Sequence, residues 1–127
     1  MFIKREFQGE MDFFKWEKIE AQTYLQNELS GITRQTLIDF ADEKASFEVR
    51  YYHFDKGSMG DYARHNREYF FYILHGYGQI KINDDLINVN PNDFVYLSPN
   101  ELVQIIPQTN KSFGFLCVTN AQTIEKK

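Results

Sequence analysis

The sequence predicts an all-β fold, a sandwich or barrel of antiparallel strands, and three observations support this class. Runs rich in β-forming residues recur along the chain, and turn residues separate them at spacings of about 8–12 residues. From residue 47 onward no helical period lies between these runs. Aromatic residues favour half-buried strands, and the 127 residues include 12 Phe and 8 Tyr. A chain of this length is enough for one core, so we expect a single domain over residues 1–127.

The amino-terminal part, residues 1–45, is predicted to be an extension made of strands and an arm. Residues 1–19 contain short aromatic clusters, which we expect to form irregular segments or short strands that pack onto the barrel. Residues 20–29 fit either a short helix or an extended arm, because their periodicity is ambiguous. Gly31 ends this segment, residues 32–39 are predicted as a strand, and residues 41–45 are predicted as a loop.

The part from residue 47 to residue 119 is predicted to be the core barrel. Gly, Asn, Asp and Pro punctuate it, and we expect turns at Gly57, Gly76, Asp84 and Pro99. The β-forming runs between these turns are predicted as strands. They cover residues 47–54, 68–74, 79–82, 86–89, 94–97, 102–106 and 112–119.

The run YFFYIL, residues 69–74, is apolar or aromatic on both faces of its strand, because alternate side chains point to opposite faces. A strand with one solvated face would alternate with polar residues. Both faces of this strand are therefore expected to be covered. The amino-terminal segment could supply the cover of the outer face, and so could a partner subunit.

The stretch DYARHNREYFFYILHGYG, residues 61–78, resembles the first signature of the cupin family. That signature runs His-x-His, three or four residues, an acid or a His, six residues and Gly. Anchored on Gly76, it places the acid or His position on Tyr69 and the two His positions on Ala63 and His65. One of the three metal ligands of this signature is therefore present.

The stretch NPNDFVYLSPNELVQ, residues 90–104, resembles the second cupin signature. In small cupins with a similar Pro99-Asn100-Glu101 turn, the fourth ligand comes two residues after the turn, and here Val103 has that position. The resemblance covers residues 47–119. It implies a double-stranded β-helix, also called a jelly-roll barrel, and a homodimer, since cupins commonly pair through sheet faces.

The residues at the four ligand positions predict that this chain lacks the family's usual metal site. Ala63 and Val103 have no donor atom, and a metal needs several donors converging at about 2.0–2.2 Å. His65 and Tyr69 alone supply too few. We therefore expect no metal and no other cofactor. Glu68 points to the opposite face of a regular strand, and only a one-residue bulge would bring it into the site.

His65 is the best candidate for a functional group in the predicted cavity. It is either a half-buried histidine hydrogen-bonded to a neighbouring tyrosine, or a ligand contact or acid/base group. Arg50 and Tyr52 share one strand face, where Arg50 either lies outside on aromatic residues or binds a carboxylate or phosphate in the cavity. His53 is expected on the other face of that strand, and His75 in a turn facing solvent. The predicted ligand-binding residues are Arg50, Tyr52, Tyr62, His65, Tyr69, Phe71 and Val103.

Other classes of function have little support in the sequence. The net charge is −4 and the charges are scattered, so a nucleic acid is not expected as a partner. No apolar run approaches the roughly 20 residues that span a bilayer, and no signal peptide is visible at the amino terminus, so we expect a cytoplasmic protein without membrane contact. The single cysteine, Cys117, is predicted to be a buried core thiol rather than a nucleophile.

The function predicted from these residues is binding of a small organic molecule in an aromatic cavity, without metal and without catalysis. The first alternative is a metal-independent isomerase, epimerase or lyase that acts on a sugar or a small organic acid. The second is a domain kept for dimerisation or partner binding, with a filled cavity. The residues alone leave open whether the protein is an enzyme.

Overall fold

The computed structural model describes residues 3–10, 13–16, 22–23 and 31–121, and these residues form almost entirely antiparallel strands. The predicted all-β fold is therefore confirmed. In chain order, the elements are β1 (Phe7–Glu10), β2 (Phe13–Trp16), β3 (Gln22–Thr23), β4 (Ile32–Ile38), α1 (Phe40–Glu43), β5 (Phe47–Phe54), β6 (Ala63–Arg64), β7 (Tyr69–His75), β8 (Gly78–Ile82), β9 (Asp85–Val89), β10 (Phe94–Leu97), β11 (Leu102–Pro107) and β12 (Phe113–Asn120).

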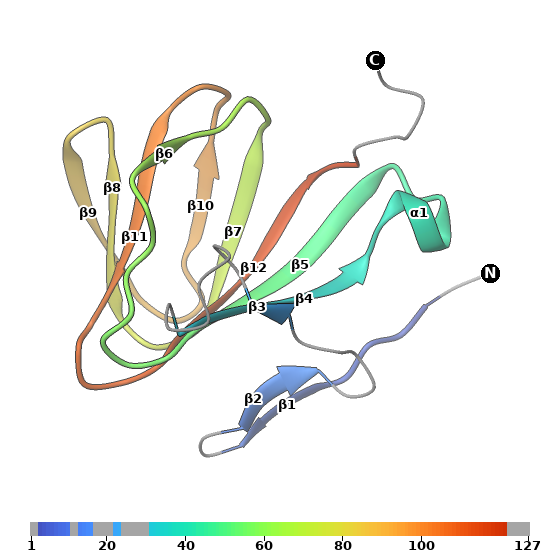
Figure 1. Ribbon diagram of the computed structural model, residues 1–127, viewed down its shortest axis with the longest axis horizontal. Coiled ribbons are helices and arrows are strands. Elements are labelled where there is room, and N and C mark those ends of the chain that lie inside the picture. Colours follow the sequence, from blue (N-terminus) through green and yellow to red (C-terminus); the bar gives the residue numbers. More distant parts are fainter. Residues whose placement is uncertain (1–2, 11–12, 17–21, 24–30, 122–127) are drawn as a thin grey trace.

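Two sheets make the barrel (Figure 1). One has six strands in the order β10-β7-β12-β5-β4-β3, and the other has four strands in the order β6-β11-β8-β9. Neighbouring strands run antiparallel throughout, and the chain passes from one sheet to the other several times, as in a jelly roll. A separate hairpin, β1–β2, lies outside the barrel below the long strands in Figure 1.

The predicted turns are confirmed. Asn83 and Asp84 have φ of 49° and 79° between β8 and β9, which is the left-handed pair of a two-residue hairpin. Gly76 has φ of 87°, and a Cβ there would lie 2.4 Å from the Ser112 carbonyl oxygen, so the turn after β7 needs glycine. The Pro99 turn is completed by Asn100, whose φ is 71°.

The segment after β4 differs from the prediction of a loop over residues 41–45. It contains the short helix α1, which begins because the Asp39 side chain accepts a hydrogen bond of 2.8 Å from the Asp42 backbone N–H. Lys44, with φ of 58°, ends it. Of residues 20–29, the helix-or-arm segment, only Gln22–Thr23 is described, and it is extended in β3; the rest lies outside the described residues.

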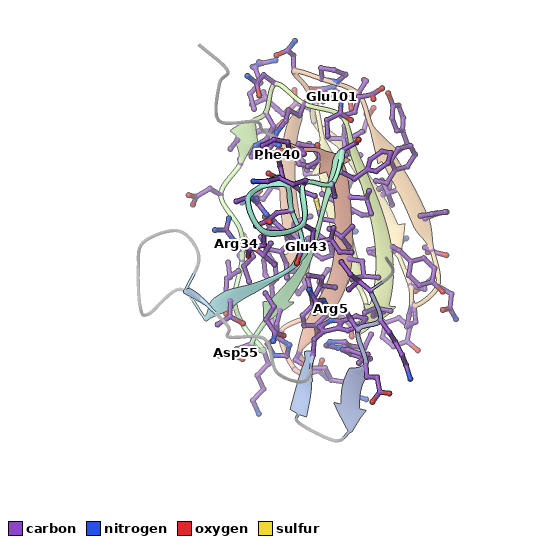
Figure 2. The ribbon with its side chains drawn as sticks, turned by 90° about the vertical axis from the view of Figure 1, so that its right-hand side faces the viewer. Arg5, Arg34, Phe40, Glu43, Asp55 and Glu101 are labelled. Carbon is purple, nitrogen blue, oxygen red and sulfur yellow. The ribbon has the colours of Figure 1, made fainter. Side chains whose placement is uncertain are left out.

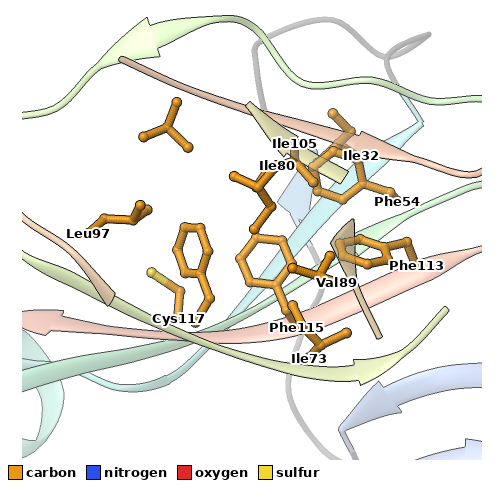
Figure 3. Close-up of a cluster of buried hydrophobic side chains, with 12 residues drawn as sticks. Ile32, Phe54, Ile73, Ile80, Val89, Leu97, Ile105, Phe113, Phe115 and Cys117 are labelled. Atoms are coloured by element: carbon orange, nitrogen blue, oxygen red, sulfur yellow. The ribbon is translucent and has the colours of Figure 1, made fainter. Parts of the chain in front are cut away.

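The hydrophobic core lies between the two sheets (Figure 3). Alternate residues of β7 and β12 point into it, as the period of two in a strand requires. In Figure 3, Leu97 and Cys117 lie at one end of the cluster and Phe54 and Phe113 at the other. The buried members are Ile32, Phe54, Phe71, Ile73, Ile80, Val89, Leu97, Val103, Ile105, Phe113, Phe115 and Cys117.

The amino-terminal arm packs on the outer face of the six-stranded sheet, as the aromatic clusters of residues 1–19 predicted. The Gln35 side chain accepts from the Trp16 backbone N–H and donates to the Trp16 carbonyl, both at 3.1 Å. The ring centres of Phe7 and Trp16 lie 5.5 Å and 6.3 Å from that of Tyr51. The arm therefore buries Tyr51, which is only 1% exposed.

Candidate functional site

A cavity of about 310 Å³ opens between the two sheets. Strands β4, β5, β7 and β12 form one wall, and β6 and β11 form the other. Sixteen residues line it: Arg34, Arg50, Tyr52, Phe54, Gly60, Asp61, Ala63, His65, Arg67, Tyr69, Phe71, Leu97, Val103, Ile105, Phe115 and Cys117.

The six-stranded sheet presents two cross-strand rows to the cavity. In one row, Arg50 of β5 pairs with Cys117 of β12, which pairs with Phe71 of β7. In the other, Arg34 of β4 pairs with Tyr52, which pairs with Phe115. Both rows change from cationic at β4 and β5 to apolar at β12 and β7. The cavity therefore has a charged side and an apolar side.

The four positions of the cupin metal ligands line this one cavity. Ala63 and Val103 are direct partners across β6 and β11, and the ring centres of His65 and Tyr69 are 5.4 Å apart. The resemblance therefore placed these residues correctly. Within the described residues, no group of three or more His, Cys, Asp or Glu side chains is arranged to hold a metal ion. The donor set that these positions present does not fit the family's metal.

His65 is half-buried at the cavity wall. Burial lowers its pKa, and the positive charge of Arg67 lowers it further, so the imidazole is neutral at pH 7. A neutral imidazole has one donor and one acceptor nitrogen. Burial raises the pKa of the neighbouring Tyr69, so its hydroxyl stays protonated. The pair offers hydrogen bonds to a polar group of a ligand without adding charge.

Buried Glu48 joins two of the arginines on the charged side of the cavity. The carboxylate, 5% exposed, has one oxygen, Oε1, at 3.1 Å from Arg50 Nη2 and 3.3 Å from Arg67 Nη1. Arg67 also donates to the Asn120 carbonyl at 2.7 Å, and its guanidinium lies 6.0 Å from the centre of the Tyr69 ring. Of the two placements open for Arg50, the structure shows the one on the cavity wall.

Sequence reasoning missed Arg34, Glu48, Asp61 and Arg67 as residues of this site. Arg34 lies in the predicted strand 32–39, where the alternation alone does not tell which face meets the cavity. Arg67 lies just before β7 and reaches the site through its long side chain. Glu48 shares the face of Arg50 and Tyr52 on β5, so the same alternation that grouped those two residues could have found it.

The structure shows where Tyr62, Glu68 and Cys117 lie. Tyr62, predicted to bind ligand, does not line the cavity: its hydroxyl accepts from the Asp84 N–H at 3.1 Å, and Lys81 lies over its ring. Glu68 points to the outer face, as predicted, and accepts a hydrogen bond of 2.7 Å from Tyr96. Cys117 is buried as predicted, and burial raises the pKa of its thiol to about 12, so it is no nucleophile at neutral pH.

A second polar cluster lies on the outer face of β5, opposite the cavity. The Tyr51 hydroxyl is 2.6 Å from His75 Nε2 and 3.4 Å from His53 Nδ1. The prediction that His53 lies on the outer face is confirmed, but the prediction that His75 faces solvent in a turn is wrong. His75 is the last residue of β7, and the arm residue Phe7 stacks on it with ring centres 6.4 Å apart.

The jelly-roll barrel, with a cavity between its two sheets, is the fold of a small cupin domain. The model of one family, the AraC-like ligand binding domain, matches residues 44–122. The chain belongs to this family, which agrees with the cupin resemblance of its two signatures.

Several similar proteins are known. A protein of Rhodospirillum rubrum named 1-methylthio-D-xylulose 5-phosphate methylsulfurylase is 26% identical over 121 residues, which cover 93% of this chain and 74% of that protein. The crystal structure of a cupin-2 domain from the same organism has a TM-score of 0.78 at 23% identity, covering 93% of this chain and 80% of that one. A cupin 2 conserved barrel domain protein from Rhodopseudomonas palustris also has a TM-score of 0.78, at 26% identity, covering 96% and 83%.

Proposed function

We propose that this cupin domain binds a small organic molecule in the cavity between its sheets, without the family's metal and without catalysis. One observation carries the proposal: the cavity of about 310 Å³ contains all four ligand positions, and two of them are Ala63 and Val103. Small-molecule sites are typically cavities of roughly this size, lined by apolar and aromatic side chains with a few polar groups.

The side chains on the wall suggest how a ligand is held. Phe71 and Val103 supply apolar contact, and the hydroxyls of Tyr52 and Tyr69 supply hydrogen bonds. His65, neutral at pH 7, supplies one donor and one acceptor. The rings of His65 and Tyr69 are neighbours with centres 5.4 Å apart, and both residues line the cavity.

Native mass spectrometry and elemental analysis of freshly purified, dialysed protein test this proposal together. We expect a bound organic molecule and no stoichiometric transition metal. Replacing His65 by Ala should leave the metal content near zero and weaken ligand binding by roughly 1–3 kcal/mol, the cost of losing a buried hydrogen bond. About one equivalent of metal in the wild-type protein, lost in His65→Ala, would show that another donor has rebuilt the metal site.

An enzyme is the second candidate, and one observation favours it. The relative from Rhodospirillum rubrum is named for a reaction on a phosphorylated sugar derivative, and it aligns with 93% of this chain. In a metal-independent isomerase, epimerase or lyase, His65 and Tyr69 would be the acid/base pair. Turnover of a sugar phosphate by wild-type protein, abolished in both His65→Ala and Tyr69→Phe, would replace the binding proposal by this one.

A homodimer is proposed as the assembly. Phe70, Phe94 and Tyr96 lie together on the outer face of β7 and β10 and are 44%, 73% and 50% exposed. β10 is also an edge strand of its sheet, and such an edge can pair with its own copy across a two-fold axis. Light scattering at tens of micromolar should give twice the monomer mass, and Phe94→Ser should shift it toward the monomer. A monomer mass for the wild-type protein contradicts this assembly.

A further inference from the structure

We infer that the ligand of this cavity is a small organic anion, with its carboxylate or phosphate group on the side of Arg34 and Arg50 and its apolar part against Phe71 and Phe115. The inference rests on the proposed binding function and adds the chemical class and the orientation of the ligand.

The balance of charge around the cavity is the first support. Three guanidinium groups line it, those of Arg34, Arg50 and Arg67. Among the described residues, the carboxylates of this wall are those of Glu48, which is buried and pairs with two of the arginines, and Asp61, which is exposed and lines the cavity. His65 adds no charge, because burial and Arg67 lower its pKa. Counted over these described side chains, three positive charges face two negative ones, and such a balance favours an anion.

The pairing of Arg50 is the second support. One oxygen of Glu48 serves both Arg50 and Arg67, so these two guanidinium groups share one carboxylate. The Nε–H group of Arg50 is buried and has no hydrogen-bond partner among the described residues. A buried donor without an acceptor costs free energy, and an arginine fork binds carboxylate or phosphate with two parallel hydrogen bonds. An anion beside Arg50 would supply the missing acceptor.

The arrangement of the two rows is the third support. Arg34, labelled beside β4 in Figure 2, and Arg50 are on neighbouring strands, in adjacent cross-strand rows of the same sheet face. Each row presents a phenylalanine two strands from its arginine: Phe71 of β7 in the row of Arg50, and Phe115 of β12 in the row of Arg34. Charge and apolar surface are thus separated across the wall. A ligand with a charged group at one end and an apolar body at the other matches this separation.

A purely structural role for the arginines predicts different behaviour. If Arg34 and Arg50 only stabilised the packing of neighbouring strands, the cavity would bind charged and neutral molecules of the same shape equally well. Their replacement would then change stability but not the preference for anions. Ligand preference therefore separates the two roles, and stability alone does not.

The test is an NMR titration of ¹⁵N-labelled protein at low salt and pH 7.5 with three probes that share a benzyl group: benzyl phosphate, phenylacetate and benzyl alcohol. We expect at least one anionic probe to bind at least tenfold more tightly than the alcohol, with shifts at the cavity residues. Tighter binding of benzyl phosphate assigns a phosphate monoester, and tighter binding of phenylacetate assigns a carboxylate. Inorganic phosphate, which lacks the apolar body, should bind more weakly than benzyl phosphate; equal affinity would overturn the proposed orientation.

Two variants and a matched control locate the effect. Arg34→Gln and Arg50→Gln should each weaken the anionic probes by tenfold or more and change benzyl alcohol by less than about twofold. Arg64→Gln removes the same charge from an exposed position on β6 that does not line the cavity, and it should change neither. If Arg50→Gln fails to fold because Glu48 loses a partner, the double variant Glu48→Gln/Arg50→Gln keeps the net charge of the group as in the wild-type protein and should show the same loss.

The outcomes distinguish this inference from the function on which it rests. If benzyl alcohol binds as tightly as the anions, and the arginine variants do not alter that ratio, the ligand is not an anion, but the cavity still binds small molecules. If none of the benzyl probes shifts a cavity residue at 10 mM and native mass spectrometry finds no bound molecule, both proposals are wrong.

Discussion

The two faces of strand β5 stabilise their buried polar groups in different ways. The inner face, with Glu48, Arg50 and Tyr52, borders the cavity and keeps its charges. The outer face, with Tyr51 and His53, lies under the amino-terminal arm and its histidines are neutral at pH 7. The face that borders the cavity therefore has charged side chains, and the face that the arm covers has side chains that are neutral at pH 7.

The physical difference is whether the group can give up its charge. A guanidinium cannot lose its proton in a protein, so Arg50 needs Glu48 as a counter-ion. A histidine can, and burial together with repulsion between the protonated forms of His53 and His75 lowers the pKa of His75 to about 4. Aromatic side chains such as Phe7 can therefore cover the outer face without any counter-ion for His75.

Removing the counter-ion should have the largest effect. Glu48→Gln leaves Arg50 and Arg67 without their shared carboxylate, and we expect the free energy of unfolding to fall by about 3 kcal/mol, the lower end for a broken buried pair. Urea denaturation measures it. The control is Glu6→Gln, which breaks an exposed pair with Lys4 whose side chains are 75% and 53% exposed, and it should change almost nothing. Equal effects of the two variants would mean that the inner face does not depend on its counter-ion.

Filling the space between the two histidines should have the next largest effect. Gly114 lies between His53 and His75 in the sheet, and a Cβ there would be 2.2 Å from His75 Nε2 and 2.5 Å from the Tyr51 hydroxyl. We expect Gly114→Ala to cost roughly 1–3 kcal/mol through overpacking, measured by urea denaturation. Gly60→Ala is the control, since a Cβ there meets atoms only at 3.6 Å and beyond. Similar stabilities for both variants would contradict tight packing of the outer cluster.

The smallest effect is the dependence of stability on pH that comes from His75 on the outer face. Because the folded pKa of His75, about 4, lies below the usual 6.5, the unfolded chain binds its proton first. Stability from this group is complete above pH 6.5 and is lost as the pH falls toward 4. We expect a loss of about 1–2 kcal/mol, reduced from the full shift because the ring is partly exposed.

Comparing the wild-type protein with His75→Gln isolates this contribution from the carboxylates that also titrate in acid. Trp16 is the single tryptophan and packs on Tyr51, so its fluorescence reports the outer face directly. The difference in stability between the two proteins should shrink from pH 7 to pH 4. A difference that stays constant over this range would show that protonation of His75 does not act on the outer face.

The sequence predicted the barrel well because turns are local. Asp84 and Gly76 mark their turns through backbone conformations that few other residues adopt, and this information lies within a few residues of each turn. The four cupin positions were found for a similar reason, since they are spaced from Gly76 and the Pro99 turn. Helix α1 was missed because a four-residue helix has too few residues to show a period.

The rest of the site depends on contacts between distant segments. Arg34 joins Arg50 only because β4 pairs with β5 in one register, and Arg67 joins them through Glu48. A one-residue change of register would turn Arg34 to the other face. His75 was misplaced because the cover over it, Phe7, comes from residues 68 positions earlier in the chain. No local pattern contains that pairing.

The position of Ala63 beside Val103 has a consequence for redesign. The two residues are neighbours across β6 and β11 on the cavity wall, and His65 lines the same cavity. The backbone frame of a metal site is therefore present, and only side chains are missing from it. The double variant Ala63→His/Val103→His would bring three imidazoles to one wall, the ligand number of many catalytic zinc sites. Two substitutions would thus supply donor atoms at the two ligand positions that lack them.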